Sequence, residues 1–116
     1  MASRTPSAAF SETVLEAAFE DTFVDTFHLL GWIGAHFRPA KTSQGWRTAV
    51  SGDGKGFPDW MLARERIVYA ELKKVGGVLS LDQRTWRDRI VAAGGEWYCW
   101  TIEDWDEIVA VLRVVS

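Results

Sequence analysis

The chain has 116 residues, 47% apolar and 25% charged, a composition typical of one globular domain. A net charge of −3 argues against a generally basic nucleic-acid-binding domain, although an enzyme that meets nucleic acid through bound cations remains compatible with it. One cysteine, Cys99, excludes an internal disulfide, and no apolar run approaches the roughly 20 residues of a membrane span. Residues 1–11 lack the pattern of a secretory signal, so we expect a cytoplasmic protein.

The first periodic segment, residues 11–30, predicts an amphipathic helix. Its apolar stripe, at steps of four, four, four and three, comprises Leu15, Phe19, Phe23, Phe27 and Leu30. Ser11 is the expected N-cap and Gly31 the expected stop. We therefore expect a flexible N-terminus over residues 1–10 and a single domain over residues 11–116.

The remaining elements follow from turn signals and short apolar runs. We expect strands over 32–37, 59–63, 67–73 and 96–101, and helices over 80–93 and 105–112. Residues 38–58, with a glycine-rich run at 51–56, predict a long irregular loop. Ser80 with Gln83 three residues later is a capping-box pattern, and Thr101 is the expected cap of the last helix. The order αβββαβα indicates an α/β fold, a mixed central sheet flanked by helices on both faces.

Aromatic residues and the cysteine carry two further expectations. Seven tryptophans are many for this length, so some should lie at the surface, where they can anchor a partner or stack on unpaired bases. Cys99 lies in the run Trp97-Tyr98-Cys99-Trp100, which favours a buried, inert thiol over a nucleophile.

The hairpin around Glu65 brings two carboxylates together if its turn is symmetric. Positions then pair when their numbers sum to 130, so Asp59 faces Glu71. Facing carboxylates repel unless a cation lies between them, and the strand period of two places Lys73 on the face of Glu71. A loop of two or four residues would shift the pairing by one. In that case Glu71 and Lys73 are ordinary strand charges, and Asp59 is a turn residue after Pro58.

The stretch Gly56-Phe57-Pro58-Asp59, then the hairpin, then Glu71-Leu72-Lys73 resembles the core motif of the PD-(D/E)XK nuclease superfamily. The order of the surrounding pieces resembles its VRR-NUC branch, in the stand-alone form carried by bacteriophages and bacteria. These pieces are Glu16 with Phe19, Gly31-Trp32, His36, Gly77 to Ser80, Gln83 with Trp86, and Gly94-Gly95. The resemblance covers about Glu12 to Leu112 and implies a restriction-endonuclease-like fold. If a phage encodes the chain, the expected compartment is the host cytoplasm.

The same resemblance implies hydrolysis of phosphodiester bonds with Mg²⁺, or Mn²⁺ as a substitute. Asp59, Glu71 and the backbone carbonyl of Leu72 would bind the metal, and Lys73 would orient the attacking water, help deprotonate it or offset charge on the phosphate. Glu16 would complete the site, in competition with Glu12 and Glu20; its alternative role is a solvent-facing helix charge. Gln83 would support catalysis, which is compatible with its capping role.

Candidate contacts to nucleic acid are basic side chains around this motif. They are His36, Arg38, Lys55, Lys74, Arg84 and Arg87. A packed histidine and a solvated basic helix face are the alternatives. The run 52–56 lacks P-loop spacing, so no nucleotide cofactor is expected.

The resulting hypothesis is a structure-selective endonuclease that acts on branched DNA such as Holliday junctions, as a homodimer. The alternatives are a nuclease for flap, single-stranded or duplex DNA, and a non-catalytic nucleic-acid-binding or assembly module that keeps the fold.

Overall fold

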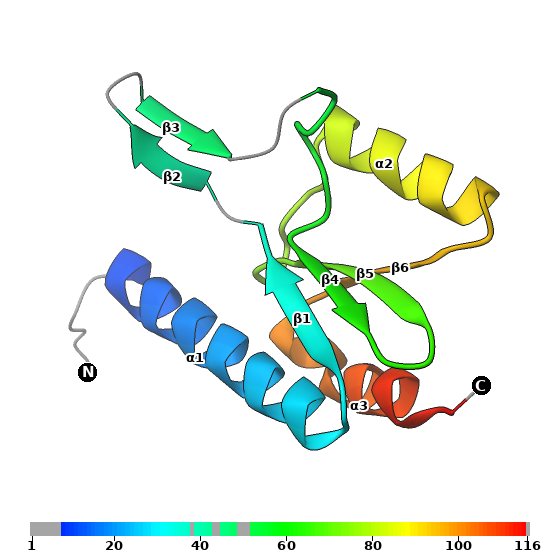
Figure 1. Cartoon of the computed structure of the whole chain (residues 1–116). Helices are drawn as coiled ribbons and strands as arrows, with labels where there is room; N and C mark the ends of the chain where they lie inside the picture. Colours follow the sequence, from blue (N-terminus) through cyan, green and yellow to red (C-terminus); the bar gives the residue numbers. More distant parts are fainter. Residues whose placement is uncertain (1–7, 38, 43–44, 49–51, 116) are drawn as a thin grey trace.

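The computed structural model describes residues 8–37, 39–42, 45–48 and 52–115 (Figure 1). Its elements in chain order are α1 (Ala8–Leu29), β1 (Ile33–His36), β2 (Pro39–Thr42), β3 (Gly45–Thr48), β4 (Trp60–Ala63), β5 (Ile67–Leu72), α2 (Leu81–Ala92), β6 (Glu96–Trp100), the 3₁₀ helix η1 (Ile102–Asp104) and α3 (Trp105–Arg113).

A four-stranded mixed sheet in the order β1-β4-β5-β6 organises the fold. Strands β1, β4 and β5 pair antiparallel, whereas β6 pairs parallel to β5. The parallel pair needs a crossover, and α2 supplies it. These findings confirm the predicted α/β class with a mixed sheet and helices.

The apolar core lies between one face of this sheet and helices α1 and α3. Strands β4 and β5 contribute alternate residues, as the period of two requires. The buried apolar residues are Phe19, Phe23, Phe27, Trp32, Trp60, Leu62, Val68, Ala70, Trp100, Ile108 and Leu112. On the opposite face, Phe57 packs edge-on against Tyr69 of β5 and Trp86 of α2. Helices therefore cover both faces.

Helix α1 departs from its prediction at the start and agrees with it at the end. It begins at Ala8 rather than after Ser11, so residues 8–10 of the expected flexible segment are helical, and residues 1–7 lie outside the described part. Leu15 is 58% exposed and does not join the buried stripe. At the other end, Gly31 N–H bonds the carbonyl of His28 and Trp32 N–H that of Phe27, the pairing of a Schellman stop.

The loop predicted over residues 38–58 is wrong over its first half. Strands β2 and β3 form a separate two-stranded sheet, and Figure 1 shows this hairpin apart from the central sheet, beyond the end of β1. Two four-residue strands without an alternating apolar pattern give no sequence signal.

The turn between β4 and β5 has the predicted length. Met61 pairs with Tyr69 and Ala63 with Ile67, so the paired numbers sum to 130. Arg64 N–H donates to the carbonyl of Arg66 across the turn at 3.0 Å.

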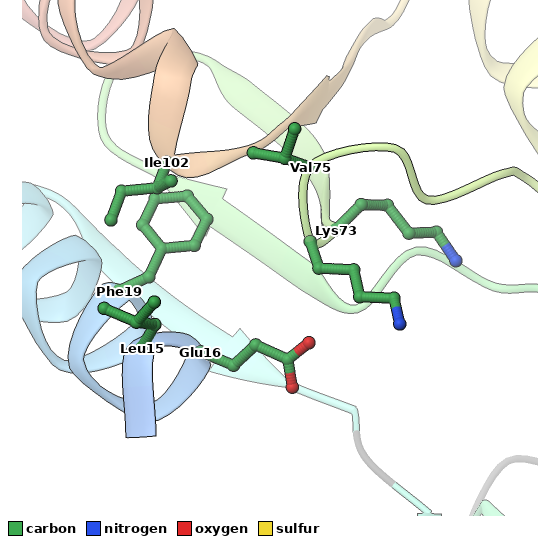
Figure 2. Close-up of a pocket in the computed structure, with 7 residues that line it drawn as sticks. Leu15, Glu16, Phe19, Lys73, Val75 and Ile102 are labelled. Atoms are coloured by element: carbon green, nitrogen blue, oxygen red, sulfur yellow. The ribbon is translucent and has the colours of Figure 1, made fainter. Parts of the chain in front are cut away.

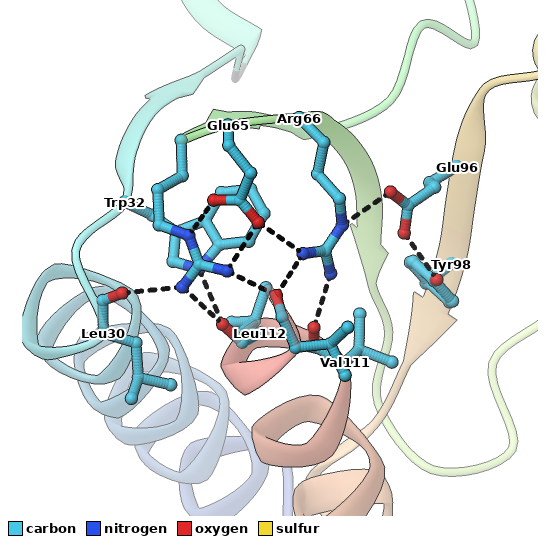
Figure 3. A network of polar contacts seen from close by, with 10 residues as sticks. Leu30, Trp32, Glu65, Arg66, Glu96, Tyr98, Val111 and Leu112 are labelled. Atoms are coloured by element: carbon cyan, nitrogen blue, oxygen red, sulfur yellow. Dashed lines mark hydrogen bonds and ion pairs between the residues drawn. The ribbon is translucent and has the colours of Figure 1, made fainter. Parts of the chain in front are cut away.

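Figure 3 shows that the same turn also joins the ends of α1 and α3. The Arg64 guanidinium donates to the carbonyls of Leu30 and Leu112, each at 2.9 Å. Arg66 donates to Glu96 Oε2 at 2.7 Å and to the carbonyl of Val111. Both guanidinium groups lie over the Trp32 ring, 4.5 and 5.0 Å from its centroid.

The remaining predictions on the second half of the chain are confirmed with small changes. Ser80 caps α2 with a full capping box, and Gly94 and Gly95 bond the last turn as a stop. Thr101 caps η1, after which α3 begins at Trp105. Within the described part of the chain, every helix is too short or too polar to cross a membrane.

None of the six tryptophans whose side chains are described is fully exposed. Three of them are buried, namely Trp32, Trp60 and Trp100, and three are half-buried, namely Trp86, Trp97 and Trp105. The high aromatic content instead builds the core, where Phe23 packs against Trp60 and Trp100 at ring distances of 5.6 and 6.1 Å.

Candidate active site

Asp59 and Glu71 stand opposite each other at one end of the central sheet. Trp60 pairs with Ala70, so the next pair outward is Asp59 with Glu71. The Asp59 carbonyl accepts a 2.7 Å bond from Phe37 N–H, which extends the pairing of β1 with β4. Leu72 N–H lies 3.4 Å from Asp59 Oδ2, a long contact toward the same carboxylate. Three adjacent strands thus hold this pair.

Glu71 is fully buried, and neither carboxylate oxygen has a hydrogen-bond partner among the described residues. Burial first, and the negative charge of Asp59 second, raise its pKa to about 8, while Lys73 acts in the opposite direction. A buried charge without a partner is costly, so either a proton held between the two carboxyl groups or a bound cation must satisfy them. The pair has the properties of a cation site.

Lys73 lies just beyond β5, where its N–H donates to the Trp100 carbonyl at 2.8 Å. Its half-buried side chain lines a depression of about 380 Å³ together with Glu16 and Glu20 of α1. Figure 2 shows the Glu16 carboxylate extending from α1 toward the segment that carries Lys73. The structure therefore brings Lys73 close both to the acid pair and to the first helix.

The choice among the helix glutamates stays open. Glu16 is exposed and shares the depression with Lys73, and Glu20 does so too while lying 3.9 Å from His36 Nδ1. The side chain of Glu12 lies outside the described residues. Among described side chains, no three acidic, histidine or cysteine groups cluster at metal-ligand spacing, and a metal-binding role for Glu16 stays a prediction.

Two carboxylates are nevertheless compatible with magnesium, which keeps several waters and is often bound through one or two carboxylates. The residues present therefore fit a hydrated magnesium ion. The groups that would hold this ion are the carboxylates of Asp59 and Glu71 and the backbone carbonyl of Leu72. The role of that carbonyl stays a prediction.

The predicted nucleic-acid contacts are spread around this site. His36 stacks on Trp60 with ring centroids 4.1 Å apart. It is therefore packed against the protein, which was the alternative to a phosphate contact. Lys74 is exposed and lines the depression beside Lys73. Arg38 lies outside the described residues. A phosphate contact remains a prediction for His36 and Lys74.

The basic residues on and near α2 have acidic neighbours. Lys55 lies 3.6 Å from Asp82, Arg87 bonds Asp88 at 2.9 Å, and Arg84 is exposed. The loop before Asp59 is held against the same helix, because a Cβ on Gly56 would lie 2.5 Å from the Asp82 backbone. This close approach explains the glycine in the Gly56–Asp59 motif.

Gln83 occupies the capping box rather than the depression. Ser80 N–H donates to Gln83 Oε1 at 2.9 Å, and Gln83 N–H donates to Ser80 Oγ at 3.1 Å. The capping prediction is confirmed, whereas catalytic support by Gln83 is still a prediction.

Sequence reasoning missed several neighbours of the site. Cys99 pairs with Glu71 across β5 and β6 and is half-buried rather than buried. Burial and then the Glu71 charge raise the pKa of its thiol, which agrees with the inert interpretation. Leu15, Val75 and Ile102 also gather near Lys73. They come from three distant segments, so no local pattern predicts their meeting.

Comparison with protein-family models and with curated protein sequences finds no match to this chain.

Proposed function

We propose that this protein is a metal-dependent endonuclease of the PD-(D/E)XK type, with a restriction-endonuclease-like fold. The observation that carries the proposal is the buried Glu71 carboxyl group facing Asp59, with both oxygens unpartnered and Lys73 nearby. Acid residues at such a position disfavour folding unless a shared proton or a bound cation neutralises them, and strongly shifted, paired carboxyl groups are a feature of functional sites. The PD…ExK sequence pattern adds the reaction, because this spacing resembles that of phosphodiester hydrolases.

Each residue has a distinct part in the proposed reaction. Magnesium bound here would act as a Lewis acid on the phosphate and offset its negative charge. Asp59 and Glu71 would hold that ion from two paired strands, whose pairing fixes the two carboxyl groups relative to each other. Lys73 orients the attacking water and stabilises the charge that grows on the phosphate oxygens. Glu16 or Glu20 reaches the water from the α1 side of the depression.

The substrate in this proposal is branched DNA such as a Holliday junction, cut by a homodimer in the cytoplasm, or in that of the host if a phage encodes the chain. A two-fold dimer places two sites on a four-way junction. Shape rather than base sequence is then recognised, because the sequence has no motif that reads base edges.

The decisive experiment is cleavage of four labelled substrates, namely a four-way junction, a flap, single-stranded DNA and linear duplex. Each is incubated with Mg²⁺, Mn²⁺ or EDTA. We expect metal-dependent cutting, fastest on the junction, and a loss of about a hundredfold or more in Asp59→Asn and Lys73→Ala. Asp106→Asn and Arg113→Ala, exposed positions on α3, are the matched controls and should cut normally.

Faster cutting of a flap, single strand or duplex would keep the nuclease and change its substrate. No cutting of any substrate, with equal DNA binding by wild type and both site variants, would overturn catalysis and favour the binding module.

A further inference from the structure

A second depression opens beside the candidate site and shares Lys73 with it (Figure 2). It has a volume of about 170 Å³. Its walls are aliphatic and aromatic, and one glutamate and two lysines add charged groups to the lining. The lining residues are Leu15, Glu16, Phe19, Lys73, Lys74, Val75 and Ile102.

The aliphatic walls are unusually open to solvent for their type. Leu15, Val75 and Ile102 are 58%, 52% and 48% exposed, and they come from α1, the segment after β5, and η1. Phe19 forms a buried floor, and its ring is held edge-on by Trp105 at 6.2 Å. Apolar side chains that converge from three segments around one hollow are a feature of ligand pockets.

The segment after β5 is built to hold this wall in place. Gly77 N–H donates to the Lys74 carbonyl at 2.9 Å, which closes a four-residue turn. Gly76 has φ +84°, the conformation that a type II turn needs at its third position. Val75 therefore stands at the second position of a defined turn, directly after the two lysines.

We propose that this pocket receives one unstacked nucleobase of the DNA strand bound at the candidate site, an inference that rests on the proposed function. The volume is close to that of an apolar cavity of about 150 Å³ that holds a benzene ring, so one base ring fits. The two lysines on the rim complement the phosphates on either side of the base. The pocket thus selects DNA with an unpaired base near the cut.

The shared Lys73 favours a nucleotide over a protein occupant. A protein or a second copy seated on these walls would also cover the depression that contains Lys73, Glu16 and Glu20. A base in the pocket leaves its own phosphate next to Lys73 instead. Extruding a base costs least where it is already unpaired, which is the case at branches and mismatches.

The first test combines a protein change with a substrate change. Wild type is compared with Leu15→Ala/Ile102→Ala on metal-dependent cleavage of branched DNA in which each nucleotide near the cut is made abasic in turn. We expect one abasic position to slow wild type about tenfold, as the loss of a stacked base does. The double variant should be slow on intact DNA and show less than about a twofold further loss at that position.

The matched control is Ile67→Ala/Val91→Ala, two aliphatic residues with 49% and 55% exposure that line neither depression. It should keep the tenfold sensitivity of wild type. Equal cleavage of intact and abasic DNA at every position, with cleavage itself metal-dependent, would refute the pocket and leave the nuclease proposal standing.

A second test needs no catalysis. Branched DNA with 2-aminopurine at the sensitive position, or at each unpaired position in turn, is bound in EDTA, with anisotropy to confirm binding. Wild type should change the probe's emission, and Leu15→Ala/Ile102→Ala should not. Either of two outcomes would assign these walls to another occupant. The first is an unchanged emission when wild type is bound. The second is a double variant that no longer dimerises but cleaves abasic DNA normally.

Discussion

Glu71 is the one fully buried charged side chain among the described residues, and its neighbours decide what its charge costs. It faces Asp59 on one side and Cys99 on the other, and within the described structure its oxygens have no hydrogen bond of good geometry, although the Asp59 carboxyl group and backbone N–H are close enough to act on its pKa. Lys73 lowers its pKa only in part. In the metal-free protein a proton neutralises the Glu71 carboxyl group up to its raised pKa, and a bound metal ion would compete with that proton for the same oxygens.

The stability of the metal-free protein should depend on pH through this residue. The Glu71 pKa is about 8 in the folded state against an ordinary 4.5, so between these pH values the folded state holds more protons than the unfolded chain. The contribution of Glu71 to the free energy of unfolding is therefore fully present below pH 4.5, and it is lost as the pH rises through 8. In EDTA, we expect Glu71→Gln to gain on the order of a few kcal/mol over wild type at pH 8.5, and little at pH 5.

Urea unfolding at the two pH values measures this difference. Glu103→Gln, an exposed glutamate on η1, is the control and should follow wild type at both. Adding Mg²⁺ at pH 8.5 should narrow the gap, because an ion bound only to the folded state stabilises wild type. If the difference in unfolding free energy between Glu71→Gln and wild type is the same at pH 5 and at pH 8.5, the raised pKa of Glu71 is ruled out.

For single residues, the sequence predicted which residues pair across the β4–β5 hairpin but not how deeply their side chains are buried. Turn length and the strand period were enough to place Asp59 opposite Glu71. The complete burial of Glu71 depends on how segments distant in the sequence pack around it, which is long-range information. The exposure of Leu15 similarly depends on where α1 leaves the core.

Among the elements, α2 allows the two roles of Gln83 to be separated. Ser80→Ala and Gln83→Ala each break one half of the capping box, so each should cost about 1 kcal/mol of folding stability. If Gln83 also supports catalysis, Gln83→Ala should lose at least about tenfold in cleavage rate, and Ser80→Ala should lose little. Urea unfolding and cleavage rates on the same variants decide it. Equal rates in the two variants would restrict Gln83 to the cap.

The β4–β5 turn lies at the end of these strands opposite the candidate site, and it binds the C-terminal ends of α1 and α3. Arg66 bonds Glu96 at 2.7 Å and the Val111 carbonyl, with its side chain only 14% exposed. A lysine cannot reproduce that fork of donors, so Arg66→Lys should cost about 2 kcal/mol. Arg87→Lys, which changes a single exposed ion pair with Asp88, should cost less than about 0.5 kcal/mol in the same urea titration. Similar costs for the two variants would mean that the turn contributes no more than a surface pair.

Elements with strong end signals were predicted well. Helix α2 begins after its cap and ends at two glycines, within a residue of expectation, because capping is local chemistry. The β2–β3 hairpin and the clasp by Arg64 and Arg66 were missed, since neither leaves an apolar period. Guanidinium groups that reach carbonyls about 30 to 50 positions away are visible only after folding.

For the whole molecule, the distribution of charge matters more than its sum. Residues 38–48 carry three cationic and no acidic side chain, and this leaves −6 for the rest of a chain whose total is −3. Within that stretch, Lys41 pairs with Trp46 and Arg47 with Ala40 in the register of β2 and β3. The hairpin leaves the central sheet directly after β1, next to Asp59. A basic arm beside an acidic site is suited to bring a phosphate backbone to it.

Salt dependence of DNA binding tests that arrangement. Each phosphate contact contributes about −0.9 to the slope of log K against log salt on duplex DNA. Lys41→Ala/Arg47→Ala should therefore flatten the slope by about one to two and weaken binding by similar factors on junction, flap and duplex, because phosphate contacts carry no sequence or branch information. Arg113→Ala on α3 should leave the slope unchanged. If the hairpin variant keeps the full slope but becomes monomeric, the arm serves contact between copies, and the acidic surface must receive DNA through cations at the site alone.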